Sequence, residues 1–131
     1  MARLDIKQKD NKIDEQWGLL KDLRKKLSVA DVTVAAGTRL ATDNDSIADM
    51  QECIDNWAAQ TQMKEGNKLK WKAADNEFYK YTKAEFTAVL AELKTLKAIR
   101  KDKLFAFAEA QRALLPLPKD HPSFTKEAWP T

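Results

Sequence analysis

The sequence predicts an α+β protein dominated by helix. It should contain three helices with one or two short β-hairpins, a long C-terminal helix and an extended proline-rich C-terminal arm. Three observations support this prediction. Apolar residues recur every three or four positions through three segments, which is the spacing of one helix face. Residues 31–42 and 68–81 instead carry strand formers and turn formers. All four prolines lie in the last sixteen residues, where no helix can continue.

The N-terminal segment, from about Leu4 to Leu27, predicts an amphipathic helix. Its apolar side chains fall on one stripe, and lysines and acids cover the remaining surface. The stripe consists of Ile6, Ile13, Trp17, Leu20, Leu23 and Leu27. The basic run at residues 24–26 falls at the predicted C-terminal end, where a helix dipole favours positive charge.

Residues 31–42 predict a short hairpin, because the Val-Thr-Val run at 32–34 favours a strand and Gly37 suits a turn. The run at residues 42–46 is rich in helix N-cap residues, so a second helix is expected to begin there. We expect this helix to end before Gly66. Its apolar face is predicted to consist of Ile47, Met50, Ile54, Trp57 and Thr61.

Residues 68–81 predict a second hairpin, because polar and apolar side chains alternate as in a half-buried strand. A two-residue loop would place Trp71 opposite Lys80. A three-residue loop at 74–76 instead places Trp71 opposite Tyr79 and brings the aromatic side chains together on one face. We therefore expect the three-residue loop.

The end of this hairpin leads directly into a helix. Asn76 tolerates the left-handed backbone that the three-residue loop requires. Thr82 and Glu85 have the spacing of a capping box, in which each side chain bonds the backbone of the other. The expected structural motif is therefore formed by Trp71, Asp75, Asn76, Thr82 and Glu85.

Four lysines are expected on the solvent face of this hairpin: Lys68, Lys70, Lys72 and Lys80. Such a row can bind phosphate beside an aromatic surface that stacks bases. It can equally protect an exposed sheet from pairing edge to edge with another chain, which is the interpretation we favour.

The last helix is expected to be long, because no glycine or proline interrupts it before Pro116. Thirty-three residues would span about 50 Å, more than the ~36 Å diameter of a compact domain of this length. The helix is therefore expected either to kink around residues 99–103 or to project from the domain. A projecting apolar seam requires a partner, and self-association, with a trimer favoured, is the simplest one. The seam residues are Leu93, Leu96, Leu104 and Phe107.

The C-terminal arm carries three large apolar side chains, Leu117, Phe124 and Trp129, which would be costly to leave in water. Either the arm folds back on its own domain, or it docks on a neighbouring subunit. The predicted organisation is an N-terminal helix over residues 1–30, an α+β domain over 31–114 and the arm over 115–131.

Charge alternates along the chain, although the formal net charge is only +3. Residues 1–30 carry a net +3, residues 31–62 a net −5, residues 63–114 a net +5, and the remainder none. Either the acidic second helix packs between basic ones, or the charged blocks complement another copy or a partner protein. The weak overall charge gives no indication of a nucleic-acid partner.

The residue types that carry most enzyme chemistry are scarce in this chain. It has one cysteine, Cys53, one histidine, His121, and three widely separated glycines. We therefore expect no catalytic site, no metal site and no cofactor, and predict a protein that is not an enzyme. No apolar run approaches the ~20 residues of a membrane span, and the N-terminus does not have the pattern of a signal peptide. No membrane partner is expected.

A series of landmarks resembles a known family. In order these are Val32-Thr-Val, Thr42-Asp-x-x-Ser46, Trp71-Lys-Ala-Ala-Asp-Asn76, Thr82-x-x-Glu85-Phe86 and Ala113-Leu-Leu. Together they resemble an uncharacterised domain family found in tail-fibre, tail-assembly and related tail proteins of bacteriophages and prophages. The resemblance covers about two-thirds of the chain and includes no catalytic residues.

This resemblance implies a virion structural protein of the phage tail, assembled in the host cytoplasm. Its partners would be other tail proteins, and its role would be that of a tail-fibre, baseplate or adaptor subunit. The alternative is a tail-fibre assembly chaperone that shields a fibre protein and is absent from the mature virion.

Overall fold

The structure is a computed structural model that describes residues 2–130, with side chains described for residues 10–130. The chain divides into two compact units. The mixed unit is Val29–Ala98, and the helical unit combines the chain up to Ser28 with the chain from Ile99 onward. The boundary thus lies inside the last helix. This differs from the predicted organisation, because the N-terminal helix and the C-terminal arm belong to one unit.

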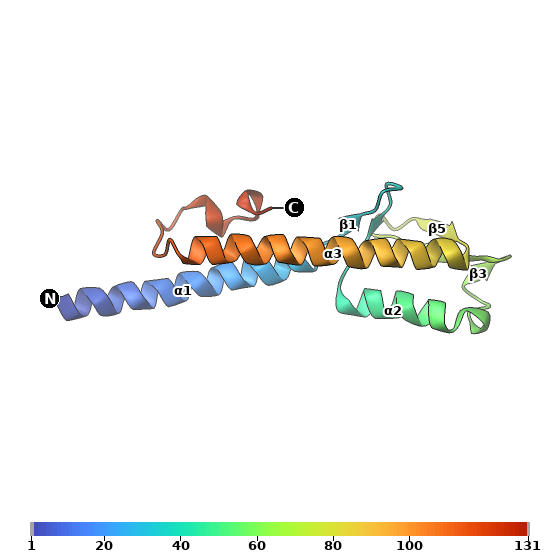
Figure 1. Ribbon diagram of the computed structural model, residues 1–131, viewed down its shortest axis with the longest axis horizontal. Coiled ribbons are helices and arrows are strands. Elements are labelled where there is room, and N and C mark those ends of the chain that lie inside the picture. The colour runs from blue at the N-terminus through green and yellow to red at the C-terminus, as the bar shows by residue number, and fades with distance from the viewer. Residues whose placement is uncertain (1, 131) are drawn as a thin grey trace. The chain divides into compact units, whose positions relative to one another are not determined.

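The elements confirm the predicted fold class, a helix-dominated α+β structure with two small antiparallel sheets (Figure 1). In chain order they are α1 Ala2–Ser28, β1 Val32–Thr33, β2 Arg39–Leu40, α2 Asn44–Asp55, β3 Lys64–Glu65, β4 Lys68–Lys72, β5 Phe78–Tyr81 and α3 Lys83–Arg112. Short 3₁₀ turns follow at Trp57–Ala59, Pro122–Phe124 and Lys126–Ala128.

The β4–β5 hairpin has the predicted register. Trp71 pairs with Tyr79, and the loop residue Asn76 has a φ of 66°, in the left-handed region. Strand β3, which was not predicted from the sequence, pairs with β4 through a tight turn at Gly66 (φ 65°). Because β3 has only two residues, both polar, it shows no alternation from which a strand could be predicted.

Helix α2 begins as predicted but ends earlier. Asp43 is its N-cap and accepts hydrogen bonds from the backbone N–H of Ser46 at 3.2 Å and from its hydroxyl at 2.6 Å. The helix ends at Asp55, because Asn56 leaves the helical conformation (φ −117°, ψ 36°). Trp57, expected on the helix, therefore lies in the following 3₁₀ turn.

Replacing the Asp43 cap gives a testable result. Asp43→Ala is expected to lower the free energy of unfolding by about 1 kcal/mol, whereas Asp43→Asn keeps a capping oxygen and costs much less. The two hydrogen bonds from Ser46 hold the pKa of Asp43 below its ordinary value. The wild-type stabilisation is therefore present at neutral pH and is lost as the pH falls below about 4. Thermal unfolding of the wild type and both variants, measured across pH, tests this prediction. The prediction would be contradicted if the Asn variant lost as much stability as the wild type on acidification through the same range.

The mixed unit packs α2, the strands and the first half of α3 around one apolar core (Figure 1). Phe86 is fully buried at its centre. The other buried members are Val34, Leu40, Met50, Cys53, Leu69, Ala73, Leu90 and Leu93.

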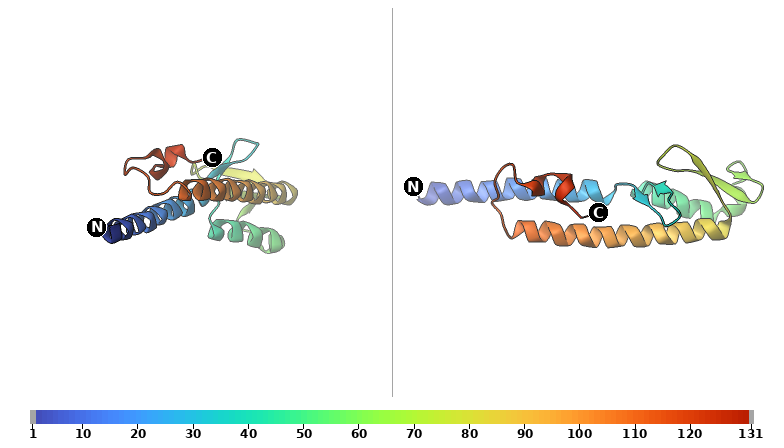
Figure 2. Two further views of the ribbon diagram at one scale, coloured as in Figure 1. Left: turned by 60° about the vertical axis from the view of Figure 1, so that its left-hand side comes forward. Right: turned by 90° about the horizontal axis from the view of Figure 1, so that it is seen from above.

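The helical unit packs α1 against the second half of α3, and the C-terminal arm runs back along these helices (Figure 2). The α1 stripe is confirmed around Leu20, which is fully buried, with Trp17, Leu23 and Leu27 packed around it. Ile13 is half-buried and is not a member of this core. The side chain of Ile6 lies outside the described residues.

A side-chain clamp fixes the arm to α1. The buried Gln16 amide donates to the Leu117 carbonyl at 2.7 Å and accepts from the Leu117 N–H at 2.9 Å. Both backbone groups at the start of the arm are thus satisfied by one side chain across 101 positions of sequence.

Truncation of this clamp is expected to loosen the arm. Gln16→Ala leaves both Leu117 backbone groups without their partner and should lower the free energy of unfolding of the helical unit by about 1–3 kcal/mol. The matched control is Gln62→Ala, because Gln62 is exposed and its truncation should change stability by less than about 0.5 kcal/mol. Chemical denaturation measures both, and equal effects would contradict the role of the clamp.

Candidate functional site

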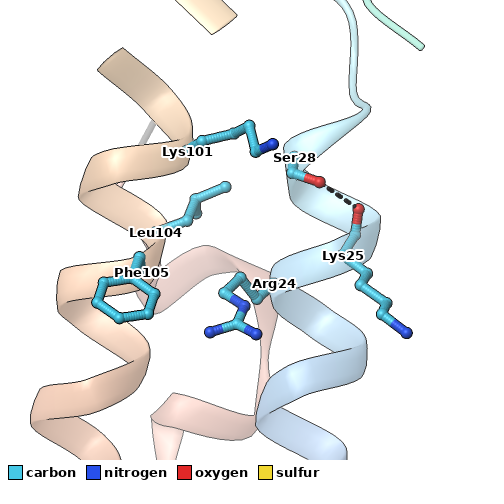
Figure 3. A pocket seen from close by; sticks show the side chains of 6 residues that line it. All are labelled: Arg24, Lys25, Ser28, Lys101, Leu104 and Phe105. Carbon is cyan, nitrogen blue, oxygen red and sulfur yellow. Dashed lines mark hydrogen bonds between the residues drawn. The ribbon is translucent and has the colours of Figure 1, made fainter. Parts of the chain in front are cut away.

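The helical unit contains an open cavity of about 310 Å³ between α1 and α3, which we call the basic pocket. Arg24 and Lys101 reach toward it from the two facing helices, whereas Lys25 is directed away from Phe105 (Figure 3). The pocket is lined by Arg24, Lys25, Ser28, Lys101, Leu104 and Phe105.

Arg24 is held in place by aromatic rings. Its guanidinium carbon lies 5.9 Å from the centroid of the Trp17 ring and 5.7 Å from that of Phe105. Both distances are typical of cation–π contacts, which orient the guanidinium without using its N–H donors. In the part of the chain whose side chains are described, no carboxylate forms an ion pair with Arg24.

Positive charge is concentrated around the basic pocket. Residues 20–28 and 99–105 together carry seven basic and two acidic side chains. Phe105 is 54% exposed beside these cations. A pocket that offers oriented N–H donors next to an exposed ring can bind carboxylate or phosphate groups attached to an apolar body.

The basic pocket was not predicted from the sequence, although the spacing of Trp17, Lys21 and Arg24 gives one indication of it. Lys21 and Arg24 follow Trp17 by four and seven positions, which places all three on one face of a helix. In the structure both cations lie within 6 Å of the Trp17 ring, and Arg112 stacks on it at 4.7 Å. The contribution of Phe105 and Lys101 depends on tertiary packing and could not be predicted from spacing alone.

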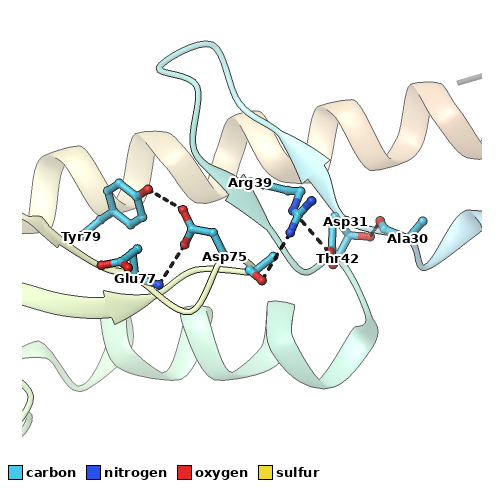
Figure 4. Close-up of polar contacts among 8 residues, drawn as sticks. Ala30, Asp31, Arg39, Thr42, Asp75, Glu77 and Tyr79 are labelled. Atoms are coloured by element: carbon cyan, nitrogen blue, oxygen red, sulfur yellow. Dashed lines mark hydrogen bonds and ion pairs between the residues drawn. The ribbon is translucent and has the colours of Figure 1, made fainter.

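The motif predicted around Asp75 stabilises the hairpin loop through hydrogen bonds (Figure 4). Asp75 accepts hydrogen bonds from the Tyr79 hydroxyl at 2.6 Å and the Glu77 N–H at 2.9 Å. These bonds lower the pKa of Asp75, and the same bond to Asp75 raises the pKa of Tyr79. Trp71 contributes to the core, with its ring centroid 5.2 Å from that of Phe86.

The capping box forms as predicted. The Thr82 N–H donates to Glu85 Oε1 at 2.9 Å, and the Glu85 N–H donates to Thr82 Oγ1 at 3.2 Å. The hydrogen bond from the Thr82 backbone lowers the pKa of Glu85, so the carboxylate form stabilises the start of α3. This feature positions the helix and presents no reactive group.

Arg39 joins the two hairpins of the mixed unit (Figure 4). Its guanidinium lies 3.8 Å from the Asp31 carboxylate and donates to the Ala74 carbonyl at 3.5 Å. Its own carbonyl accepts from the Ala74 N–H at 2.9 Å. These contacts brace the loop that carries Asp75.

The four predicted seam residues on α3 lie in intramolecular cores. Leu93 and Leu104 are fully buried, Leu93 in the mixed unit and Leu104 in the helical unit. Leu96 and Phe107 are half-buried against the same two cores. This corrects the expectation of a seam exposed for self-association, because the elements of each unit cover its own part of α3.

The arm residues also pack within the helical unit. Trp129 is 3% exposed, its ring centroid lies 4.7 Å from that of Phe107, and its indole N–H donates to the Ser123 carbonyl at 2.8 Å. Phe124 and Leu117 are half-buried in the same unit. Of the two alternatives left open by the sequence, the structure therefore places the arm on its own domain.

Cys53 and His121 are the residues with the greatest catalytic potential, and the contacts of both are structural. Cys53 is buried, and burial raises the pKa of its thiol, with Glu52 and Asp49 adding to the effect. His121 is half-buried, and its Nδ1 accepts from the Ser123 N–H at 3.1 Å, capping a 3₁₀ turn.

Among the residues with described side chains, no group of three His, Cys, Asp or Glu could hold a metal ion. No described helix is long and apolar enough to cross a bilayer.

The lysine row is partly neutralised by the strand that the sequence analysis missed. Lys70 and Lys80 are opposite each other as predicted, but Glu65 on β3 lies 3.1 Å from Lys80. The hydrogen bond and charge of Lys80, together with the charge of Lys70, lower the pKa of Glu65. The acidic side chain therefore compensates the repulsion expected within the row.

Comparison with protein families matches residues 10–115 to a domain of unknown function, DUF4376. That range includes most of α1, the whole mixed unit and all of α3. The chain belongs to the DUF4376 family. No curated protein and no solved structure matches the chain significantly.

The DUF4376 match includes the basic pocket and excludes most of the arm. Arg24, Lys101 and Phe105 lie inside the matched range, whereas Phe124 and Trp129 lie beyond it. The pocket is thus built from the DUF4376 domain itself.

Proposed function

We propose that this DUF4376 protein is a non-enzymatic structural protein of a bacteriophage tail that acts through protein–protein assembly. The tail setting rests on the resemblance of its landmarks, from Val32-Thr-Val to Ala113-Leu-Leu, to a family of phage tail proteins. Its place would be that of a fibre, baseplate or adaptor subunit, with other tail proteins as partners.

The observation that carries the proposal is the basic pocket with its exposed aromatic edge. Aromatic and arginine side chains dominate the binding energy of protein interfaces, and Arg24 and Phe105 line this pocket and contact each other. Leu19 and Leu114, also in the helical unit, are 49% and 60% exposed. These side chains give an assembly partner further apolar contacts on the helical unit.

The proposal is tested by mass spectrometry of purified phage particles and of the lysate from which they came. A structural role predicts peptides of this chain in the particles, in a constant ratio to known tail proteins. An assembly chaperone, the alternative, would be found in the lysate with a fibre protein and would be absent from the particles. Absence from the particles would overturn the structural role.

A further inference from the structure

We infer that the basic pocket binds the acidic face of helix α2 from a second copy of this chain, so that copies associate head to tail. This inference rests on the proposed assembly function and names the partner of the same site.

The pocket provides cationic side chains from two facing helices. Arg24 is fixed between two aromatic rings, and Lys101 is exposed on the facing helix. In the described part of the chain, no ion pair involves Arg24, Lys25 or Lys101. The pocket can therefore accept carboxylates without first breaking a salt bridge.

Helix α2 provides the matching charge. It carries four carboxylates and no basic residue. Asp45, Asp49 and Glu52 are exposed and follow one another by four and three positions, which forms one continuous face. None of these three forms an ion pair with the described side chains. The opposite face, with Met50 and Cys53, is buried in the core, so the acidic face is turned outward.

The two surfaces lie in different units of the chain, so a contact between copies is heterologous. The pocket of one copy would receive α2 of the next copy, which leaves one pocket and one α2 unoccupied in each pair of copies. Such contacts close into rings or extend into open chains.

Charge-swapped variants test the inference by light scattering after size exclusion. Pocket variant Arg24→Glu/Lys101→Glu and helix variant Asp49→Lys/Glu52→Lys should each be monomeric, with the dissociation constant raised at least about tenfold. Mixing the two variants should restore association, because each reversed surface then meets a complementary one. High salt should dissociate the wild type by screening the attraction.

Two further variants distinguish a loss of association from a loss of folding. Lys25→Glu/Lys101→Glu changes two exposed side chains and should also weaken association. Lys119→Glu/Lys126→Glu makes the same charge change at two exposed positions in the arm and should leave the molar mass unchanged.

Three results would overturn the inference. These are a wild type that stays monomeric at high micromolar concentration, an oligomer that both reversals leave intact, and a mixture that does not reassociate. Each is distinct from failure of the proposed function, which is decided by the composition of phage particles.

Discussion

Phe86→Ala is expected to lower the free energy of unfolding of the mixed unit by about 3–5 kcal/mol. Phe86 is fully buried, and three aromatic rings surround it. The centroids of Trp57, Trp71 and Tyr81 lie 6.4, 5.2 and 5.7 Å from that of Phe86, in tilted geometries. Truncation removes these ring contacts and leaves a cavity between α3 and the sheet, which the fixed strands can only partly fill.

Chemical denaturation followed by tryptophan fluorescence measures this effect, because Trp57 and Trp71 border the cavity. The matched control is Phe78→Ala, since Phe78 has the same side chain but is 63% exposed. The control should change stability by no more than about 0.5 kcal/mol. A similar loss in both variants would show that Phe86 is not the centre of this core.

Trp129→Ala is expected to have the largest effect in the helical unit, also about 3–5 kcal/mol. The indole is buried against Phe107 and is anchored by its hydrogen bond to the Ser123 carbonyl. Its loss removes the apolar anchor of the arm and leaves the Ser123 carbonyl without that donor. The arm then keeps the Gln16 clamp and the hydrogen bond from the Ser123 hydroxyl to Gln111 at 2.6 Å, but without its buried indole it should open to solvent more readily.

Amide hydrogen exchange shows which segments lose protection in the Trp129→Ala variant. Amides of the arm should lose protection, together with those of α1 around Leu20, whereas the strands of the mixed unit should keep theirs. Trp129→Phe keeps an aromatic ring at this position but loses the hydrogen bond and part of the buried indole volume, so it should cost less than Trp129→Ala. Leu114→Ala, at a 60% exposed side chain, is the neutral control. Unchanged protection in the arm of the alanine variant would contradict the fold-back contact.

Local signals in the sequence were sufficient for much of the fold. The aromatic pairing of Trp71 with Tyr79 predicted the hairpin register, and the Thr82–Glu85 spacing predicted the start of α3. Both features depend on residues within a few positions of each other. The Asp43 cap was predictable for the same reason.

Features that depend on distant contacts could not be predicted in this way. Apolar spacing showed that Leu93 and Leu104 need cover, but it could not show that other elements of the same chain provide it. The Gln16–Leu117 clamp joins positions 101 residues apart, and no local pattern marks it. The basic pocket could not be predicted from local spacing either, because Arg24 and Phe105 meet only when α1 packs against α3.

Association between copies is tested most directly by cross-linking an equal mixture of isotope-labelled and unlabelled chains. A carbodiimide joins an amine to a carboxylate with which it is in contact, and mass spectrometry of the linked peptides identifies both residues. The pocket and α2 predict links from Lys101 or Lys25 to Asp49 or Glu52, with about half of these pairs combining one labelled and one unlabelled peptide. Links that never combine the two labels, or no links at these residues, would contradict self-assembly through the basic pocket.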